Sequence, residues 1–508
     1  MFELSIALKY LIPKKGSLAS ALISMMSVIV ISLVIWLVLV FLSVTAGIEK
    51  NWLQRLTTLH APIRISPTQA YYNSYFYQID TLACNSNYTY KTIGEKREAP
   101  FADPFSPEVD PEIPNYFPRQ DLSEDGSLLD PVQKAFQALD QVQKEVPSLH
   151  FQDYEISGAL MRLTLKNTAS TLSQMSYLLS LPDQNPRLHA LFIPPAEGPL
   201  DFDTPPAKSP PYAHFVQGKL TLPELGSDIP AILPKTYRDG GAQIGDRGTL
   251  SYSAFSAVSM QEQKVSFRIV GFYDPGVMSV GNKCILIPKE ITRDIYATTQ
   301  TFSPDGTPTN GIFVWNASLN DTDAIAKKIQ KELVAKGVDA YWKVATYEEF
   351  EFAKDLLYQF RSDRTLLLII AAIILIVACC NIISLLVLLV SDKRKEIAIL
   401  QSMGASFKSI AFIFGGCGAI MGALSCLIGS LLAIITLHNL ESLIAFLSMI
   451  QGRSAFNPAF FGQTLPNHLS IEALLFVLIA TPILSCLAGL IPAIKASRVQ
   501  PSHALRAE

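Results

Sequence analysis

Hydrophobic residues in this chain gather in four long windows, and the sequence between them mixes polar and apolar positions. The windows are residues 18–46, 366–390, 410–437 and 471–491. Each is long enough to cross a hydrocarbon core of roughly 30 Å as a helix that rises about 1.5 Å per residue. We therefore expect an α-helical membrane domain of four spans, with residues 49–362 forming a large α+β extracytoplasmic insert.

The second window belongs to a longer stretch, residues 347–403, that contains neither glycine nor proline. Nothing in its local chemistry forces the backbone to break. Its first part is charged and amphipathic, with Phe350, Ala353, Leu357 and Phe360 at helical spacing. If this part and the span form one helix, the rod is roughly 65 Å long. We expect it to act as a transmission shaft between the insert and a cytosolic element.

The second half of the insert predicts two kinds of structure. Short strands punctuated by glycine and proline indicate a β-rich subdomain over residues 190–290. Residues 311–362 then predict a β-α-β unit followed by the stalk helix. Its strands are expected to pair with strands near residues 63 and 160, which gives an α+β domain that the β-rich subdomain interrupts.

Residues 68–150 show no sustained periodicity. They combine many tyrosines with a run rich in proline, aspartate and glutamate. This composition predicts a loop-rich, partly mobile elaboration. The tyrosines either pack within that irregular structure, which the pattern favours, or bind a partner.

Lysine and arginine residues in the short connections set the expected orientation. They gather before the first window, between the second and third, and after the fourth, and are nearly absent between the third and fourth. By the positive-inside rule, residues 1–17 form a cytosolic interfacial helix, 391–408 a cytosolic coupling helix, and 492–508 a cytosolic tail. Residues 438–470 are then an extracytoplasmic loop. Pro492 is expected to end the fourth span.

Charge and motifs exclude several function classes. The 508 residues carry a formal net charge of −3 without a basic stripe, so nothing indicates nucleic-acid binding. No P-loop, nucleophile-elbow or zinc-protease motif occurs, and the histidines lack metal-ligand spacing. We expect a non-catalytic subunit with no metal and no cofactor of its own. Any energy source must then come from another subunit.

Two smaller features concern packing and cross-linking. Gly418 and Gly422 are four residues apart in the third window, a spacing that lets helices approach closely. Asn381 is the main polar residue of the second window, and an interhelical hydrogen bond explains it most simply. Cys84 and Cys284 stand alone in the insert, and the sequence leaves open whether they form a disulfide in an oxidising compartment.

Two stretches resemble a known family. Residues 381–406, with a Lys-Arg-Lys-Glu-Ile-Ala string, are similar to the second span and coupling helix of the FtsX-like, MacB-type ABC transporter permeases. Residues 491–506, which begin with Ile-Pro-Ala and end with Ala-Leu-Arg, resemble the closing pattern of that family. Within the family, residues 6–11 and 47–49 look most like the lipoprotein-releasing permeases, the LolC and LolE group.

The resemblance implies a multi-pass protein of the bacterial inner membrane, with both termini cytosolic and the insert periplasmic. The implied partners are a cytosolic P-loop ABC ATPase that binds the ATP, a second permease copy or a paralogue, a lipoprotein substrate, a periplasmic lipoprotein carrier and membrane lipid. Such complexes use ATP to lift lipoproteins from the inner membrane and pass them to the carrier. The resemblance leaves open whether the permease pairs with itself or with a related subunit.

The resemblance also places ATPase coupling in the segment after the second span. The residues implied are Lys393, Arg394, Lys395, Glu396, Ile397, Leu400, Met403 and Gly404. The three basic residues are expected to hold the interfacial register, and Ile397, Leu400 and Met403 to pack into the ATPase cleft. Gly404 suits a helix C-cap.

Three alternatives stay open. A MacB-like mechanotransmission exporter of peptides or small molecules fits the same family. An FtsX-type signalling scaffold fits less well, because such proteins usually have a much smaller insert. A membrane-anchored enzyme is disfavoured by the missing catalytic motifs.

Overall fold

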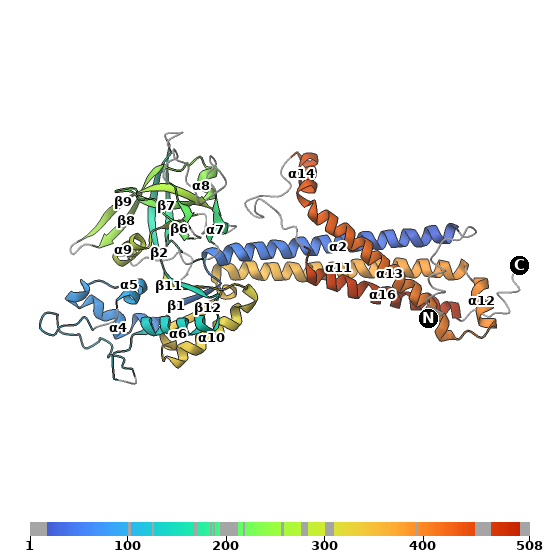
Figure 1. Cartoon of the computed structure of the whole chain (residues 1–508), viewed down its shortest axis with the longest axis horizontal. Helices are drawn as coiled ribbons and strands as arrows, with labels where there is room; N and C mark the ends of the chain where they lie inside the picture. The colour runs from blue at the N-terminus through green and yellow to red at the C-terminus, as the bar shows by residue number, and fades with distance from the viewer. Residues whose placement is uncertain are drawn as a thin grey trace. The chain divides into compact units, whose positions relative to one another are not determined.

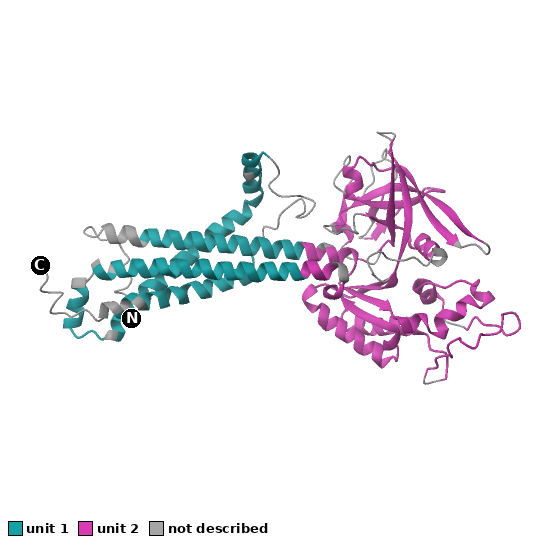
Figure 2. Cartoon of the chain, turned by 180° about the vertical axis from the view of Figure 1, so that it is seen from behind, with its two compact units in different colours: residues 1–51, 358–508 teal, residues 52–357 magenta. Residues whose placement is uncertain are grey.

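The computed structural model describes most of the chain in two compact units. The described residues are 18–99, 103–123, 126–165, 170–182, 185, 188–193, 212–216, 219–255, 259–275, 283–299, 309–392, 394–452 and 469–497. Unit 1 comprises residues 1–51 and 358–508, and unit 2 comprises residues 52–357 (Figure 2). The predicted helix 1–17 lies outside the described residues. Two helices, α2 (Leu18–Leu59) and α11 (Glu351–Asp392), contribute residues to both units.

Unit 1 is a helical bundle. Besides parts of α2 and α11 it contains α12 (Arg394–Ser402), α13 (Phe407–His438), α14 (Leu440–Gln451) and α16 (Ile471–Ser497). Four of the described helices, α2, α11, α13 and α16, are long and apolar enough to cross a membrane. They lie side by side (Figure 1) and share an apolar core that includes Leu39, Ile382, Met421 and Val477.

Glycines let α13 approach its neighbours closely. A methyl group at Gly422 would lie 2.6 Å from the Ser485 hydroxyl oxygen on α16, and one at Gly418 would meet the Ser485 backbone carbonyl. A methyl group at Gly429 would lie 2.7 Å from the Ser32 carbonyl oxygen on α2. The indole of Trp36 on α2 also donates a hydrogen bond of 2.8 Å to the Thr436 hydroxyl on α13.

The helices differ from the predicted boundaries at three places. The first apolar helix does not stop near residue 46, because α2 continues through Gly47 to Leu59. The prediction that Pro492 ends the fourth apolar helix is wrong, since α16 continues to Ser497 with both Pro482 and Pro492 inside it. A proline removes only one helical hydrogen bond, so a helix can continue past it with a kink. The helix predicted over residues 347–390 begins later than expected, because Tyr347–Glu349 forms a 3₁₀ turn and Phe350 is extended. From Glu351 the helix α11 is continuous to Asp392, and Ala353 and Leu357 are buried on it.

The first layer of unit 2 is a sheet covered by two helices. Strands β12 (Trp342–Thr346), β1 (Ile63–Pro67), β11 (Asn310–Trp315) and β2 (His150–Thr164) pair in that order, all antiparallel. Helices α6 (Pro131–Glu145) and α10 (Thr322–Ala335) pack against Ile312 and Val314 of β11. The alternate residues Phe313 and Trp315 belong to a second buried cluster, which explains why β11 is apolar on both faces. The predicted pairing with the strand near residue 63 is confirmed. Strand β11 pairs with His150–Glu155 of β2, whereas the part of β2 near residue 160 pairs with other strands.

The second part of unit 2 is a closed barrel. The sheet continues from β2 through β3 (Thr171–Ser180), β10 (Cys284–Ile287), β7 (Ile229–Pro234) and β9 (Met260–Tyr273). Strand β8 (Arg247–Phe255) pairs with both β9 and β2 and so closes the ring (Figure 1). The barrel therefore contains β2 and β3 as well as strands from the predicted range 190–290. Smaller elements surround it: α7 (Leu188–Leu191), β4 (Phe192–Ile193), β5 (His214–Val216), β6 (Lys219–Thr221), α8 (Lys235–Asp239) and α9 (Lys289–Thr299).

The tyrosine-rich elaboration is irregular, and most of its described tyrosines pack inside it. It contains α3 (Gln69–Tyr72), α4 (Tyr75–Gln78) and α5 (Ile93–Glu98). Tyr71 is fully buried and lies 5.4 Å, ring to ring, from Trp342, while Tyr77 stacks on Tyr90 at 4.6 Å. Cys84 and Cys284 do not form a disulfide in this structure.

A buried ionic network joins the barrel to this elaboration. Asp153 of β2, with no exposed side-chain surface, accepts from Lys289 at 2.8 Å and from Arg293 at 3.1 Å, both on α9. Arg293 also pairs with Glu98 of α5 at 3.0 Å. A side chain at Gly94 would clash with the Arg293 guanidinium, so this glycine leaves the space through which Arg293 passes.

Within the part of the chain that the structure describes, neither carboxyl oxygen of the buried Glu155 has a hydrogen-bond partner. The Arg293 Nε lies 4.0 Å from the Glu155 Oε1. Burial, reinforced by the negative charge of Asp153, raises the pKa of Glu155 to about 8. For Asp153, burial opposes ionisation, but Lys289 and Arg293 outweigh it and lower the pKa.

The raised pKa of Glu155 predicts a pH dependence of stability. A carboxyl that holds its proton more tightly when folded stabilises the fold below its unfolded pKa, and this contribution is lost as pH rises through the folded value. We expect the free energy of unfolding to fall between about pH 5 and pH 8, and Glu155→Gln to flatten that slope. Thermal unfolding from pH 5 to pH 9 measures it. Glu145→Gln, at an exposed carboxylate, should keep the wild-type slope, and an unchanged slope in Glu155→Gln would contradict the prediction.

Candidate functional site

The short helix α12 and the turn after it form the first candidate site. The backbone N–H of Gly404 donates to the Gln401 carbonyl and that of Ala405 to the Leu400 carbonyl, both at 3.0 Å. Gly404 has a φ of +94°, which an L-residue rarely adopts. This is the Schellman arrangement with glycine after the C-cap, and it confirms the predicted cap. Ser406 then caps α13 by accepting from the Ser409 N–H at 3.2 Å.

The two faces of α12 differ in exposure. Ile397 and Ala398 are buried, and Ile397 belongs to the apolar core of the bundle. Glu396 is exposed, as are 47% of Ile399 and 79% of Met403. One side of this short helix therefore packs in the bundle, and the other side is open to solvent.

The structure separates the residues predicted for coupling. Ile397 packs within the bundle, so it does not face outward together with Met403 as expected. Leu400 is half-buried between the two faces. Arg394 and Lys395 lie in the first turn of α12, and Lys393 is outside the described residues. The sequence pattern did not indicate Ile399, whose side chain is exposed. The spacing of Ile397, Leu400 and Met403 predicts that they share one outward face, but only packing determines which face of α12 turns inward.

The residues predicted for helix packing lie on α11 and α13. Gly418 and Gly422 face Ser485 of α16, as described above. Asn381 is half-buried on α11. Within the described part of the bundle, no hydrogen bond joins its side chain to another helix, so the predicted interhelical bond is not formed there.

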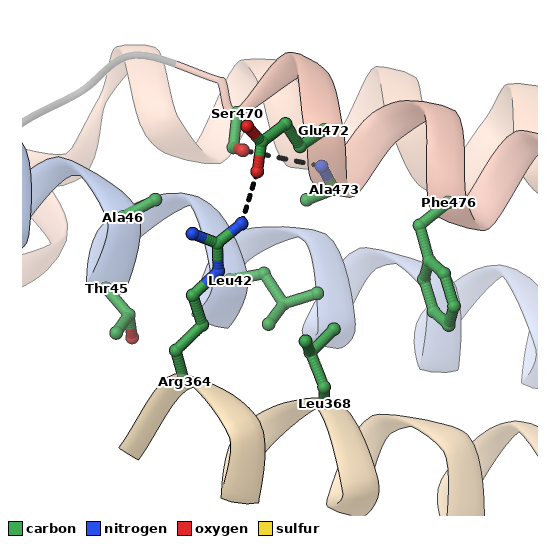
Figure 3. Close-up of a pocket in the computed structure, with 9 residues that line it drawn as sticks. All are labelled: Leu42, Thr45, Ala46, Arg364, Leu368, Ser470, Glu472, Ala473 and Phe476. Carbon is green, nitrogen blue, oxygen red and sulfur yellow. Dashed lines mark hydrogen bonds and ion pairs between the residues drawn. The ribbon is translucent and has the colours of Figure 1, made fainter. Parts of the chain in front are cut away.

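The second candidate site is a cavity of about 210 Å³ beside the start of α16, where that helix lies next to α2 and α11 (Figure 3). Arg364 of α11 reaches toward Glu472 of α16 and forms an ion pair with it. Leu42 of α2, Leu368 of α11 and Phe476 of α16 supply apolar walls. The other lining residues are Thr45, Ala46, Ser470 and Ala473.

This cavity has a polar and an apolar part, which suits an amphiphilic molecule better than a fully polar one. Side-chain exposure is 46% for Arg364 and 77% for Glu472, so the ion pair lies at the open edge. Sequence reasoning missed the site. Two charged residues could have indicated it. Arg364 lies just before the uncharged second window, and Glu472 lies at the start of the fourth window.

Comparison with known proteins identifies the helical part. Residues 368–501 match the family model "FtsX-like permease C-terminal". These residues are an FtsX-like permease domain. This domain contains α12, α13, α14 and α16 with most of the apolar part of α11, and so includes the whole of the first candidate site.

Curated relatives match the chain over a limited region. It is 36% identical over 121 residues to the lipoprotein-releasing system transmembrane protein LolC of Haemophilus influenzae, covering 24% of this chain and 28% of the relative. It is 36% identical over 120 residues to LolE of the same organism, covering 23% and 29%. LolC of Xylella fastidiosa is 29% identical over 128 residues, covering 24% and 30%. The matches thus span less than a third of the length of these relatives.

Proposed function

We propose that this chain is the transmembrane permease subunit of an ABC complex that extracts lipoproteins from the bacterial inner membrane and releases them to a periplasmic carrier. A separate P-loop ATPase binds and hydrolyses the ATP, and the chain itself is non-catalytic and needs no cofactor. A second permease, identical or paralogous, completes the complex. The observation that carries the proposal is the FtsX-like permease domain with its similarity to LolC and LolE.

The proposed orientation follows from the basic connections. Both termini and α12 face the cytosol, and unit 2 lies in the periplasm. The exposed side chains of Glu396, Ile399 and Met403 then form the surface offered to the ATPase. Apolar side chains exposed on a cytosolic helix are a sign of a covered surface.

Helix α11 provides a physical route for coupling. It has 42 residues, contains no glycine or proline, and passes from residues of unit 2 to residues of unit 1. It ends next to α12 in the sequence. Because such a helix has no built-in kink, displacement of α12 by the ATPase would be passed along α11.

The cavity is the proposed contact with lipid or lipoprotein. In the proposed orientation it lies at the periplasmic end of α16, beside the adjoining stretches of α2 and α11. Its apolar walls would receive acyl chain, and Arg364 would face an anionic headgroup.

The proposal predicts an uncoupled phenotype for the exposed face of α12. We expect Ile399→Asp combined with Met403→Asp to reduce ATP-driven lipoprotein release at least about tenfold, because charged residues would replace the apolar contact with the ATPase. The measurement is lipoprotein release from proteoliposomes that contain the permease complex. Met449→Asp is the matched control, since Met449 is 85% exposed on α14, outside the predicted cytosolic surface.

Thermal unfolding of the purified permease distinguishes uncoupling from misfolding. The double variant should unfold within about 2 °C of wild type, since exposed substitutions change stability little. Wild-type release by this variant would contradict the assignment of α12 to the ATPase interface.

A further inference from the structure

Residues 103–123 of unit 2, here called the acidic loop, contain no helix and only one isolated bridge, from Leu122 to Leu128. Figure 1 shows this region of the chain extending from the unit beside α4 and α6. Its backbone is nevertheless held at defined points by aspartate side chains.

Asp110 holds the middle of the acidic loop. Its two carboxylate oxygens accept from the backbone N–H groups of Cys84 and Ser106, each at 2.7 Å. The Asp110 side chain is 9% exposed. These backbone hydrogen bonds lower its pKa, so it stays ionised and keeps both bonds at neutral pH.

Asp103 and Asp121 hold the ends. Asp103 accepts from the Tyr75 hydroxyl at 2.9 Å and from the Gln120 amide at 3.0 Å. Asp121 accepts from the Tyr341 hydroxyl at 2.5 Å. Prolines at 104, 107, 111, 114 and 118 fix further backbone angles. The loop is therefore preorganised without regular secondary structure.

Large apolar side chains of the acidic loop are exposed to solvent. Exposure is 84% for Tyr116, 66% for Val109, 60% for Leu122 and 38% for Ile113. The neighbouring Phe117 instead packs against Tyr75, with ring centroids 6.4 Å apart. Single exposed apolar residues need no explanation, but several on one preorganised loop are typical of an interaction surface.

The negative charge of the loop restricts the kind of surface that it can bind. Its acidic residues are Asp103, Glu108, Asp110, Glu112 and Asp121, against one basic residue, Arg119. Glu108 and Glu112 are exposed and flank Val109 and Ile113 along the chain. Anionic lipid surfaces repel such a loop, whereas a basic protein surface attracts it.

We propose that the acidic loop is a docking element for a folded protein that presents an apolar groove bordered by lysine and arginine. Tyr116 and its apolar neighbours enter the groove, and Glu108 and Glu112 face the basic border. Because the loop is ordered before binding, little conformational entropy is lost on association. The proposal does not depend on lipoprotein transport.

Site-specific photocrosslinking in cells tests this docking. The photoreactive residue p-benzoylphenylalanine replaces Tyr116 in the full chain, and mass spectrometry identifies the adducts. The matched position is Tyr88, which is 52% exposed in the same elaboration but outside the loop. We expect one protein adduct at Tyr116 that is at least about fivefold weaker at Tyr88.

Charge reversal makes the test specific. Glu108→Lys with Glu112→Lys should reduce the Tyr116 adduct at least about fivefold, and the captured protein should bind the purified full chain more weakly as salt rises. Its crosslinked peptide should be apolar with flanking basic residues. Adducts to lipid or to a second copy of this chain, the absence of an adduct, or an adduct unaffected by charge reversal would each overturn the proposal.

Discussion

Replacing Arg293 by methionine is expected to lower the free energy of unfolding of unit 2 by about 3 kcal/mol, because it removes one partner of a buried charge. Asp153 would keep Lys289 at 2.8 Å and the partly exposed Arg97 at 3.7 Å, and Glu98 would lose its partner on α9. The methionine retains most of the apolar volume of the side chain, so the lost charge dominates. Thermal unfolding of the purified full chain in detergent measures the effect, which should be several degrees.

An exposed ion pair in the same unit provides the control. Lys328 pairs with Glu145 at 2.9 Å, and both side chains are about half exposed, at 50% and 56%. Lys328→Met should change the free energy of unfolding by less than about 0.5 kcal/mol, as expected for solvated pairs. If Arg293→Met were no more destabilising than Lys328→Met, the network would not be the junction described here.

Gly418→Ala is expected to destabilise the helical bundle by about 2 kcal/mol, although alanine favours helix more than glycine does. The added methyl group would meet the backbone carbonyl of Ser485 on α16, which cannot rotate away as a side chain can. Relief requires α13 and α16 to move apart along a contact that Gly422 and Gly489 also keep close. The midpoint of thermal unfolding in detergent reports the change.

The same substitution at Gly415 should have the opposite sign. A methyl group there would lie 3.5 Å from the Leu490 side chain, an ordinary van der Waals distance. Gly415→Ala then gains helix propensity, up to about 1 kcal/mol, without a clash. Equal midpoints for the two alanine variants would show that close packing at Gly418 does not hold α13 against α16.

Local signals in the sequence predict the elements well. The uncharged run 366–390, continuous with an amphipathic segment free of glycine and proline, predicts α11 because both properties are read residue by residue. Strands β1, β11 and β12 are predicted for the same reason, whereas the part of β2 that pairs with β11, His150–Glu155, was not predicted. The positive φ of Gly404 is also predictable. This glycine follows a helical segment and lies two residues before Ser406, which caps the next helix.

The distant contacts that close the barrel and form the buried ionic network were not predictable. Closure of the barrel depends on β8 pairing with β2, some ninety residues earlier, and no periodicity encodes that partner. Asp153 and Arg293 are 140 residues apart, so their pairing becomes visible only in the fold. The burial of Ile397 against the bundle was not predicted. A helix with apolar residues on two sides does not specify which side its neighbours cover.

Identification of the proteins that copurify with the full chain in mild detergent tests the central claim most directly. The proposed function predicts a P-loop ABC ATPase together with acylated lipoproteins, with a second permease if the complex is heteromeric. An ATPase recovered with an adaptor and an outer-membrane tunnel protein, and no lipoprotein, would contradict lipoprotein release and indicate an exporter. Recovery without any ATPase would contradict the ABC permease assignment itself.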